Sequence, residues 1–93
     1  MLKVNEYFDG QVKSIGFQSE SKPASVGVME PGEYEFATAA AEVMVVVSGV
    51  LTVILPGESN WTSYKAGEQF HVGADQVFQV KIAQQSAYLC LYG

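Results

Sequence analysis

The side chains best suited to acid–base or nucleophilic chemistry are scarce in this sequence. It contains one histidine, His71, one cysteine, Cys90, and five lysines, but no arginine. An imidazole with an ordinary pKa of about 6.5 could act as a general acid. However, His71 alternates with Phe70 and Val72, so we expect it to face away from the interior, at the surface or at an interface. Cys90 lies in an apolar run without a neighbouring base, which favours a buried small hydrophobe over a nucleophile.

The charge balance argues against a nucleic acid partner. Ten carboxylates and five lysines give a formal net charge of −5 at pH 7, which is the wrong sign for binding along a phosphate backbone. The lysines are scattered, and Lys22, beside Pro23 in a polar stretch, is the one most free to reach a small anion.

Short β-branched or aromatic runs follow one another through the chain, at the spacing of about 8–12 residues that is typical of sandwiches and barrels. Glycine and proline pairs such as Pro31-Gly32 and Pro56-Gly57 separate the runs. The stretch 37–42 is too short for a stable helix, so we interpret it as a strand end and loop. The expected strands are 25–29, 33–38, 43–47, 50–55, 61–64, 69–72, 77–82 and 87–92. The sequence therefore predicts one all-β domain over residues 1–93.

Alternation predicts which side chains face the core. In 33–38, Glu33 and Glu35 belong in water, so the even-numbered residues should point inward. In 77–82, Gln79 and Lys81 indicate the same parity. The expected inward residues are Tyr34, Phe36, Thr38, Phe78, Val80 and Ile82.

The last expected strand has no polar face. Its even positions are Tyr88, Cys90 and Tyr92, and its odd positions include Leu89 and Leu91. We expect this strand to be covered on one side by its own barrel, and on the other by a second subunit or the N-terminal segment. A homodimer is the expected assembly.

The sequence gives no indication of secretion or of membrane insertion. The first ten residues lack a charged leader followed by an apolar region and a cleavage site, so we expect a cytoplasmic location. The apolar stretch 43–55 is interrupted by Ser48, Gly49 and Thr52, and it is shorter than the roughly 20 residues of a membrane-spanning helix.

Three residues have the spacing of a known metal-binding motif. Gly32, Glu42 and Gly49 resemble the first motif of the cupins, and a second half-motif begins at Gly67. The resemblance implies a single cupin domain of the RmlC-like kind, either a β-barrel or a jelly-roll sandwich.

The histidines of a metal-binding cupin are missing. The positions that best match them are Thr38, Ala40 and Phe78, and only Glu42 remains as a ligand. Because a catalytic metal needs about three protein ligands, we expect this domain to work without metal.

Strings of residues along the whole chain carry a closer resemblance. They are NEYF at 5–8, VKSIGF at 12–17, ASVGVM at 24–29, GEY at 32–34, SG at 48–49, LPG at 55–57, AG at 66–67 and YLC at 88–90. In this order and spacing they resemble the small bacterial pyrimidine/purine nucleoside phosphorylase family. The resemblance implies cleavage of nucleosides by inorganic phosphate to ribose 1-phosphate and free base, with broad tolerance for the base. It implies no cofactor, inorganic phosphate being the co-substrate.

The resemblance and the cupin spacing both place Glu42 at the mouth of the barrel. Its carboxylate could accept hydrogen bonds from ribose hydroxyls, which makes it the candidate catalytic residue; the alternative is an exposed loop glutamate. Tyr34, Phe78 and Tyr88 share the inward parity and could stack on a base, or simply fill the core. Thr38 could donate to phosphate or sugar, or satisfy a nearby backbone group.

The phosphate ligands are not evident. In the absence of arginine, phosphate must be held by lysine, by backbone N–H groups in a glycine-rich turn, or by hydroxyls. A non-enzymatic cupin that binds a small ligand is the alternative function, and a purely structural or regulatory partner protein is a third. Free base should appear only in the presence of phosphate if the first hypothesis holds.

Overall fold

Alternating apolar and polar residues form ten strands in the computed structural model, which describes residues 2–93. The strands are β1 (Lys3–Tyr7), β2 (Val12–Gln18), β3 (Pro23–Met29), β4 (Gly32–Ala37), β5 (Glu42–Ser48), β6 (Val50–Ile54), β7 (Thr62–Lys65), β8 (Gln69–Val72), β9 (Val77–Ile82) and β10 (Ser86–Tyr92). Within residues 2–93 there is no helix that could cross a membrane. The all-β prediction is confirmed.

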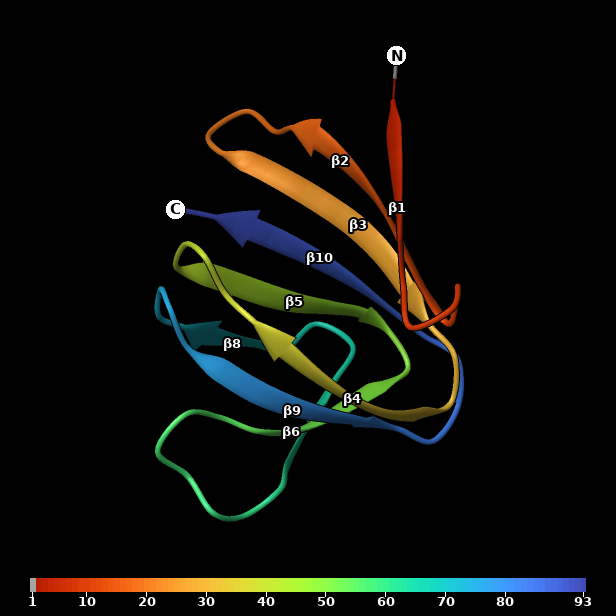
Figure 1. Cartoon of the computed structure of the whole chain (residues 1–93), viewed down its shortest axis with the longest axis vertical. Helices are drawn as coiled ribbons and strands as arrows, with labels where there is room; N and C mark the ends of the chain where they lie inside the picture. The colour runs from red at the N-terminus through yellow and green to blue at the C-terminus, as the bar shows by residue number, and fades with distance from the viewer. Residues whose placement is uncertain (1) are drawn as a thin grey trace.

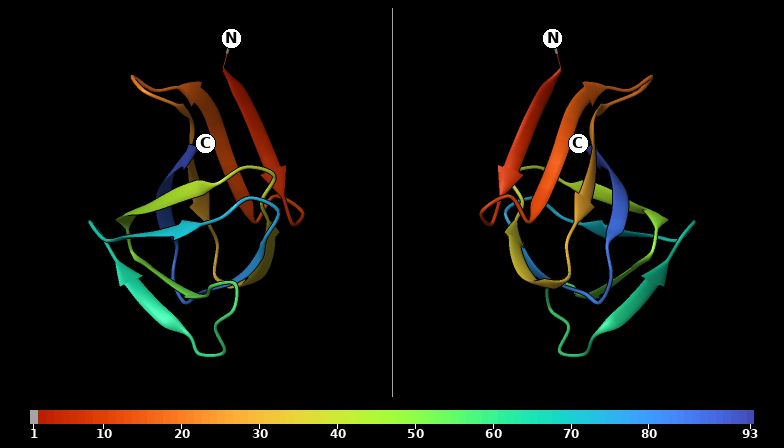
Figure 2. Two further views of the ribbon diagram at one scale, coloured as in Figure 1. Left: turned by 90° about the vertical axis from the view of Figure 1, so that its left-hand side faces the viewer. Right: turned by 90° about the vertical axis from the view of Figure 1, so that its right-hand side faces the viewer.

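Two antiparallel sheets face each other. One has the order β1-β2-β3-β10-β5-β8 and the other the order β4-β9-β6-β7. The sheets stay separate instead of closing into one barrel, so the sandwich is the observed one of the two expected forms (Figure 1). The β1–β2 hairpin extends from one end of the molecule and β7 from the other (Figure 2).

The core between the sheets follows the predicted parity. Phe78, Val80 and Ile82 on β9 are buried, and Tyr34 on β4 is buried with them. Phe36 packs against this core while remaining partly exposed. The even-numbered residues of both strands therefore point inward, as the alternation predicts.

The expected strands do not include β1 and β2, and the pattern of β2 explains why. Its inward side carries the small residues Ser14 and Gly16, while Ile15 and Phe17 on its outer side are 39% and 40% exposed. Val12 is fully buried and Lys13 is exposed, but over residues 14–17 the usual arrangement of apolar residues inside and polar residues outside is reversed, so polarity gives no clear strand signal there.

Strand β10 lies in the middle of the six-stranded sheet, paired with β3 and β5. Its inner residues Tyr88 and Cys90 are buried, while Leu89 and Leu91 on the outer side are only partly buried. The N-terminal segment pairs with β2 at the edge of the sheet and lies beside it, instead of covering β10. Of the two covers expected for the outer side, the N-terminal segment is therefore the wrong one.

Candidate active site

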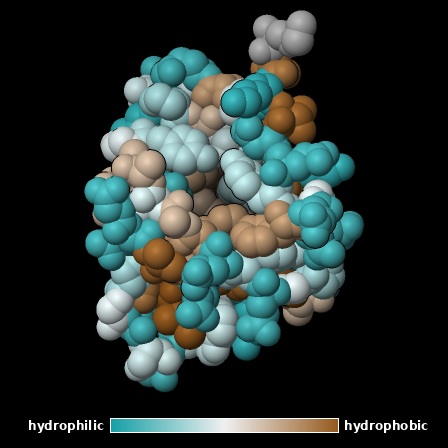
Figure 3. Space-filling view, in the orientation of Figure 1, coloured by the Kyte–Doolittle hydropathy of each residue, from teal (hydrophilic) through white to brown (hydrophobic). Residues whose placement is uncertain are grey.

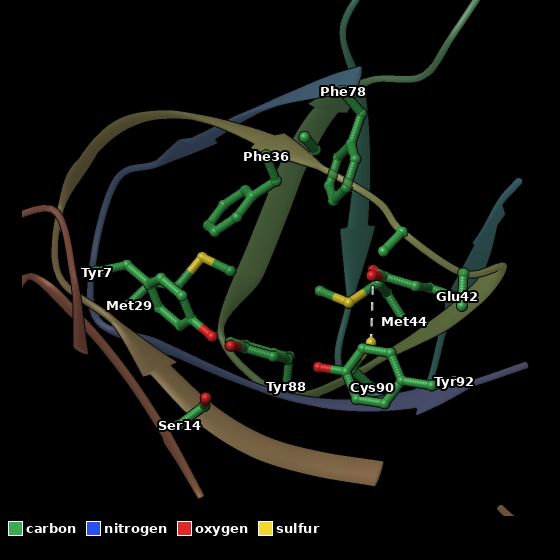
Figure 4. Close-up of a pocket in the computed structure, with 13 residues that line it drawn as sticks. Tyr7, Ser14, Met29, Phe36, Glu42, Met44, Phe78, Tyr88, Cys90 and Tyr92 are labelled. Carbon is green, nitrogen blue, oxygen red and sulfur yellow. Dashed lines mark hydrogen bonds between the residues drawn. The ribbon is translucent and has the colours of Figure 1, made fainter. Parts of the chain in front are cut away.

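The two sheets enclose a cavity of about 440 Å³, a size typical of small-molecule sites. The molecular surface is hollowed in the view of Figure 3, and Figure 4 shows the side chains around the cavity. Its lining residues are Tyr7, Ser14, Met29, Phe36, Ala37, Ala39, Ala40, Glu42, Met44, Phe78, Tyr88, Cys90 and Tyr92. Seven different strands and the loop after β4 therefore contribute to one cavity.

One wall of the cavity is apolar. Phe36 on β4 and Phe78 on β9 are register partners, and their rings stack with centroids 5.7 Å apart and planes inclined by 27°. Met29 and Met44 extend this wall from the opposite sheet (Figure 4). Such a wall offers a planar ligand stacking and dispersion contacts but no hydrogen bond that would select one ring from another.

Glu42 is the only carboxylate among the described lining residues. It is the first residue of β5 and lies opposite Tyr92 of β10, so its side chain points into the cavity from the strand end. The Cys90 thiol donates a hydrogen bond to Glu42 Oε1 at 3.5 Å. Partial burial raises the pKa of Glu42, and the hydrogen bond from Cys90 lowers it in part. Its second oxygen is free to accept a hydrogen bond from a ligand.

The neighbours of Glu42 on β10 are neutral groups. Burial, followed by the nearby Glu42 carboxylate, raises the pKa of Cys90 to about 12, so the thiol stays protonated at neutral pH and is a poor nucleophile. The expected buried position of Cys90 is confirmed. Burial also raises the pKa of Tyr92, whose hydroxyl forms a hydrogen bond of 2.8 Å with Ser25.

Tyr88 crosses the floor of the cavity over a glycine. Ser14 on β2, Gly27 on β3 and Tyr88 on β10 are consecutive partners across three strands. A Cβ atom on Gly27 would lie 2.5 Å from the Tyr88 hydroxyl oxygen, so only glycine leaves room for the ring. Burial raises the pKa of Tyr88 to about 12, and the nearby Ser14 hydroxyl lowers it in part. The tyrosine hydroxyl is therefore a proton donor over the physiological range.

The turn between β1 and β2 brings Tyr7 to the cavity. Phe8 and Asp9 have φ angles of 54° and 57°, a left-handed conformation that non-glycine residues seldom adopt. The Phe8 ring packs 5.0 Å from the Tyr34 ring and 5.4 Å from the Phe36 ring, measured between centroids. These contacts hold the turn against β4, next to the point where Tyr7 enters the lining.

Two of the predicted substrate-binding residues lie outside the cavity lining. The Tyr34 hydroxyl donates to the Glu30 carbonyl at 2.6 Å. Thr38 is buried; its hydroxyl donates to the Gly73 carbonyl at 2.6 Å and accepts from the Gln76 amide at 2.9 Å. Both hydroxyls are thus occupied within the protein, while Glu42, Phe78 and Tyr88 of the predicted set line the cavity together.

The cationic side chains of this chain do not reach the cavity. No lysine or histidine is among its described lining residues. His71 is exposed on the outer side of β8, in the predicted direction. The Lys22 ammonium donates to the Gly93 carbonyl at 2.8 Å, and Lys81 lies over the Trp61 ring, 4.3 Å from its centroid.

The residues at the cupin metal positions do not fit a metal ion. Thr38 is used by the Gly73 carbonyl, Ala40 offers no ligand atom, and Phe78 is stacked on Phe36. Among residues 2–93, no three histidine, cysteine or carboxylate side chains come together as a metal site. Glu42 is thus left as a single oxygen ligand, too few for a catalytic metal.

Sequence reasoning did not identify Tyr7, Ser14 and Tyr92 as cavity residues. Tyr7 and Ser14 lie on β1 and β2, which have no clear strand signal. Tyr92 shares the parity of Tyr88, so the alternation of β10 contained the information needed to find it. The position of Ser14 in the cavity follows from its pairing with Gly27 on β3, which in turn pairs with Tyr88 on β10. This pairing can be recognised only once the register of the strands is known.

Comparison with known proteins agrees with the fold and the strings of residues. A family model described as pyrimidine/purine nucleoside phosphorylase matches residues 2–92. The pyrimidine/purine nucleoside phosphorylase of Shewanella pealeana is 68% identical over 93 residues, covering 100% of both chains. That of Alcanivorax borkumensis is 61% identical over 93 residues, covering 100% of this chain and 99% of the relative.

Solved structures resemble the chain over its full length. The crystal structure of a Vibrio parahaemolyticus protein of unknown function superposes with a TM-score of 0.95 at 47% identity, covering 100% of this chain and 99% of that one. An RmlC-like cupin from Shewanella frigidimarina gives a TM-score of 0.77 at 19% identity, with 98% and 82% coverage, and shows the fold alone. The cupin fold, the family match over residues 2–92 and the full-length relatives establish that this chain belongs to the pyrimidine/purine nucleoside phosphorylase family.

Proposed function

We propose that the chain is a metal-independent nucleoside phosphorylase with broad base specificity, and that the cavity is its active site. Inorganic phosphate attacks the anomeric carbon of the ribose through one oxygen. The C–N glycosidic bond breaks, and its electron pair leaves with the base, which takes a proton from solvent. The products are ribose 1-phosphate and the free base. The observation that carries this proposal is a stacked aromatic wall facing a wall of hydroxyls and one carboxylate.

The apolar wall is suited to the base. Phe36 and Phe78 present ring surface, and the methionines adapt to ring size because their side chains are flexible and polarisable. No amide or guanidinium side chain lines the described cavity to read one edge of a purine or pyrimidine. Stacking without edge recognition accepts either kind of base.

Glu42 is suited to the ribose. Positive charge develops on the sugar as the glycosidic bond breaks, and the ribose hydroxyls then become better hydrogen-bond donors. A carboxylate held in a partly desolvated position accepts these bonds more strongly in the transition state than in the bound substrate. Because Cys90 and Tyr92 beside it are neutral, its charge is not cancelled by a neighbouring cation.

The test is phosphate-dependent release of base. Purified protein is incubated with one purine and one pyrimidine ribonucleoside, with and without phosphate, and base and ribose 1-phosphate are measured by chromatography and mass spectrometry. Equal amounts of both products, formed only with phosphate, support the proposal. Saturable nucleoside binding without product would instead indicate the non-enzymatic binding cupin.

We further propose that the enzyme is a cytoplasmic homodimer that associates through the outer side of the six-stranded sheet. Leu89 on β10, Val26 on β3, Ile15 on β2 and Val4 on β1 are consecutive cross-strand partners on this side. Val26 is 44% exposed and Val4 is 57% exposed. These residues form a continuous apolar row across four strands. Such a row, unlike single scattered exposed residues, is typical of an interface between subunits.

A further inference from the structure

Three hydroxyl groups come together on one side of the cavity. Ser14 and Tyr88 are brought together because Tyr88 lies across Gly27, which separates them in the sheet. Tyr7 reaches the same place from the end of β1. In Figure 4 the three hydroxyl oxygens point toward one another, and Glu42 lies on the opposite side of the cavity.

Two of these hydroxyls belong to buried residues that line the cavity. Ser14 is 4% exposed and Tyr88 is 6% exposed. Other buried hydroxyls have internal partners, such as Ser25 with Tyr92 at 2.8 Å and Thr38 with the Gly73 carbonyl at 2.6 Å. Ser14 and Tyr88 both line the cavity, and the Ser14 hydroxyl is close enough to Tyr88 to act on its pKa as a hydrogen-bond partner. A hydroxyl can take part in more than one hydrogen bond, so each of these groups can also bond to a ligand or to water in the cavity.

Charge decides which part of the ligand fits these hydroxyls. Ribose hydroxyls need an acceptor, which Glu42 provides. Phosphate needs donors and is repelled by a carboxylate, so it is most stable on the side of the cavity farthest from Glu42. That side holds Tyr7, Ser14 and Tyr88, and no lysine or histidine lines the described cavity that could bind the anion elsewhere within it.

We propose that the hydroxyls of Tyr7, Ser14 and Tyr88 form the subsite for inorganic phosphate, built from neutral donors alone, with Gly27 as a positioning residue that admits the Tyr88 ring. This inference rests on the proposed function, since it takes phosphate as the co-substrate. Each hydroxyl donates to a phosphate oxygen, while the phosphate retains its negative charge for attack on the anomeric carbon. The anion is oriented without a salt bridge that would reduce its nucleophilicity.

The experiment compares Ser14→Ala and Tyr88→Phe with Ser25→Ala. Ser25 is a matched control because it is 3% exposed in the same sheet and its hydroxyl is occupied by Tyr92. Two quantities are measured for each protein: the KM for phosphate at saturating nucleoside, and direct binding of inorganic phosphate by line broadening in phosphorus NMR. Circular dichroism and melting temperature establish that each variant is folded.

We expect Ser14→Ala and Tyr88→Phe each to weaken phosphate about 10- to 100-fold in both measurements, the effect of one lost hydrogen bond to a charged group. The KM for nucleoside should stay within about threefold of the parent value, and Ser25→Ala should bind phosphate as the parent does. Unchanged phosphate binding in both folded variants would overturn the subsite, and so would an equal loss in Ser25→Ala. If the parent releases no base with phosphate present, the proposed function fails, while the NMR measurement still decides whether the hydroxyls bind the anion.

Discussion

Replacing Glu42 by glutamine tests the catalytic role of the carboxylate most directly. The amide keeps the shape of the side chain and one hydrogen-bonding oxygen, but it removes the only negative charge in the described cavity lining. Oε1 already accepts from the Cys90 thiol at 3.5 Å, so one oxygen remains for the ribose.

The size of the effect follows from this geometry. One hydrogen bond to a charged group contributes about 1.5–3 kcal/mol, and about 1.4 kcal/mol corresponds to a tenfold change in rate. In Glu42→Gln the one amide oxygen accepts from the Cys90 thiol and the amide nitrogen faces the ribose, so this bond is lost and kcat should fall about 10- to 100-fold. Losing the attraction between the carboxylate and the positive charge on the sugar extends the range to about 1,000-fold. Because both interactions are stronger in the transition state, the fall should appear mainly in kcat.

The assay is the initial rate of base release at varied nucleoside concentration and saturating phosphate. Glu35→Gln is the matched control, because it removes one negative charge in the same way but on the exposed outer side of β4. His71→Asn, on the outer side of β8, should also leave kcat nearly unchanged. Full activity in Glu42→Gln together with a large loss in His71→Asn would refute the reasoning and make the histidine the catalytic acid. Circular dichroism must show that every variant is folded at the assay temperature for the comparison to hold.

Five further outcomes are expected. Burial raises the pKa of Glu42, so the folded state favours its protonated form. The parent should therefore lose stability relative to Glu42→Gln as pH rises through that pKa, and the two melting temperatures should converge in acid. Thermal denaturation at several pH values measures both. Base release should fall as pH drops through the same pKa, because the ionised carboxylate is the active form; a flat pH profile of kcat/KM would contradict this. Gly27→Ala should displace the Tyr88 ring and raise the KM for phosphate about tenfold or more, whereas a structural role alone would lower the melting temperature and leave KM unchanged. Leu89→Glu and Leu91→Glu should each convert a dimer to a monomer in light scattering, and a monomeric parent with both variants folded would rule out that interface. Dialysis against a strong chelator should leave turnover unchanged, and loss of activity restored by a stoichiometric transition metal would show that the site uses metal after all.

The sequence predicted the architecture where chemistry and periodicity coincide. In β4 and β9, charged or polar residues alternate with aromatic and branched ones. The charged side must face solvent, so Phe36 and Phe78 on the other side must point inward. The same alternation placed His71 on the outer side of β8. The sequence also shows that the cupin histidines are missing. Ala40 and Phe78 have no ligand atom at those positions, and the Thr38 hydroxyl is bonded to the Gly73 carbonyl.

Parity did not separate residues that line the cavity from residues that fill the core. Tyr34 and Tyr88 have the same parity, yet Tyr34 is held by the Glu30 carbonyl and Tyr88 faces the cavity. Thr38 likewise points inward but fastens the 73–76 loop through Gly73 and Gln76. Whether an inward hydroxyl is bonded within the protein depends on backbone carbonyl groups that the fold brings close to it. The alternation within a single strand carries no information about these groups.

The reversed pattern of β2 follows from the job that its inward face performs. A strand that closes a dry core gains most by burying large apolar side chains, and β2 does so only at Val12, while the rest of its inward side carries Ser14 and the half-buried Gly16. Such a strand contributes less hydrophobic stabilisation per residue than its neighbours do. The loss is offset if its small residues leave room for a ligand and if its outer residues Ile15 and Phe17 are covered by a second subunit. The small residues on the inward side of residues 14–17 leave β2 without a clear strand signal, and so do the apolar residues on their outer side. These two features are what the proposed active site and the proposed subunit interface would require of this strand.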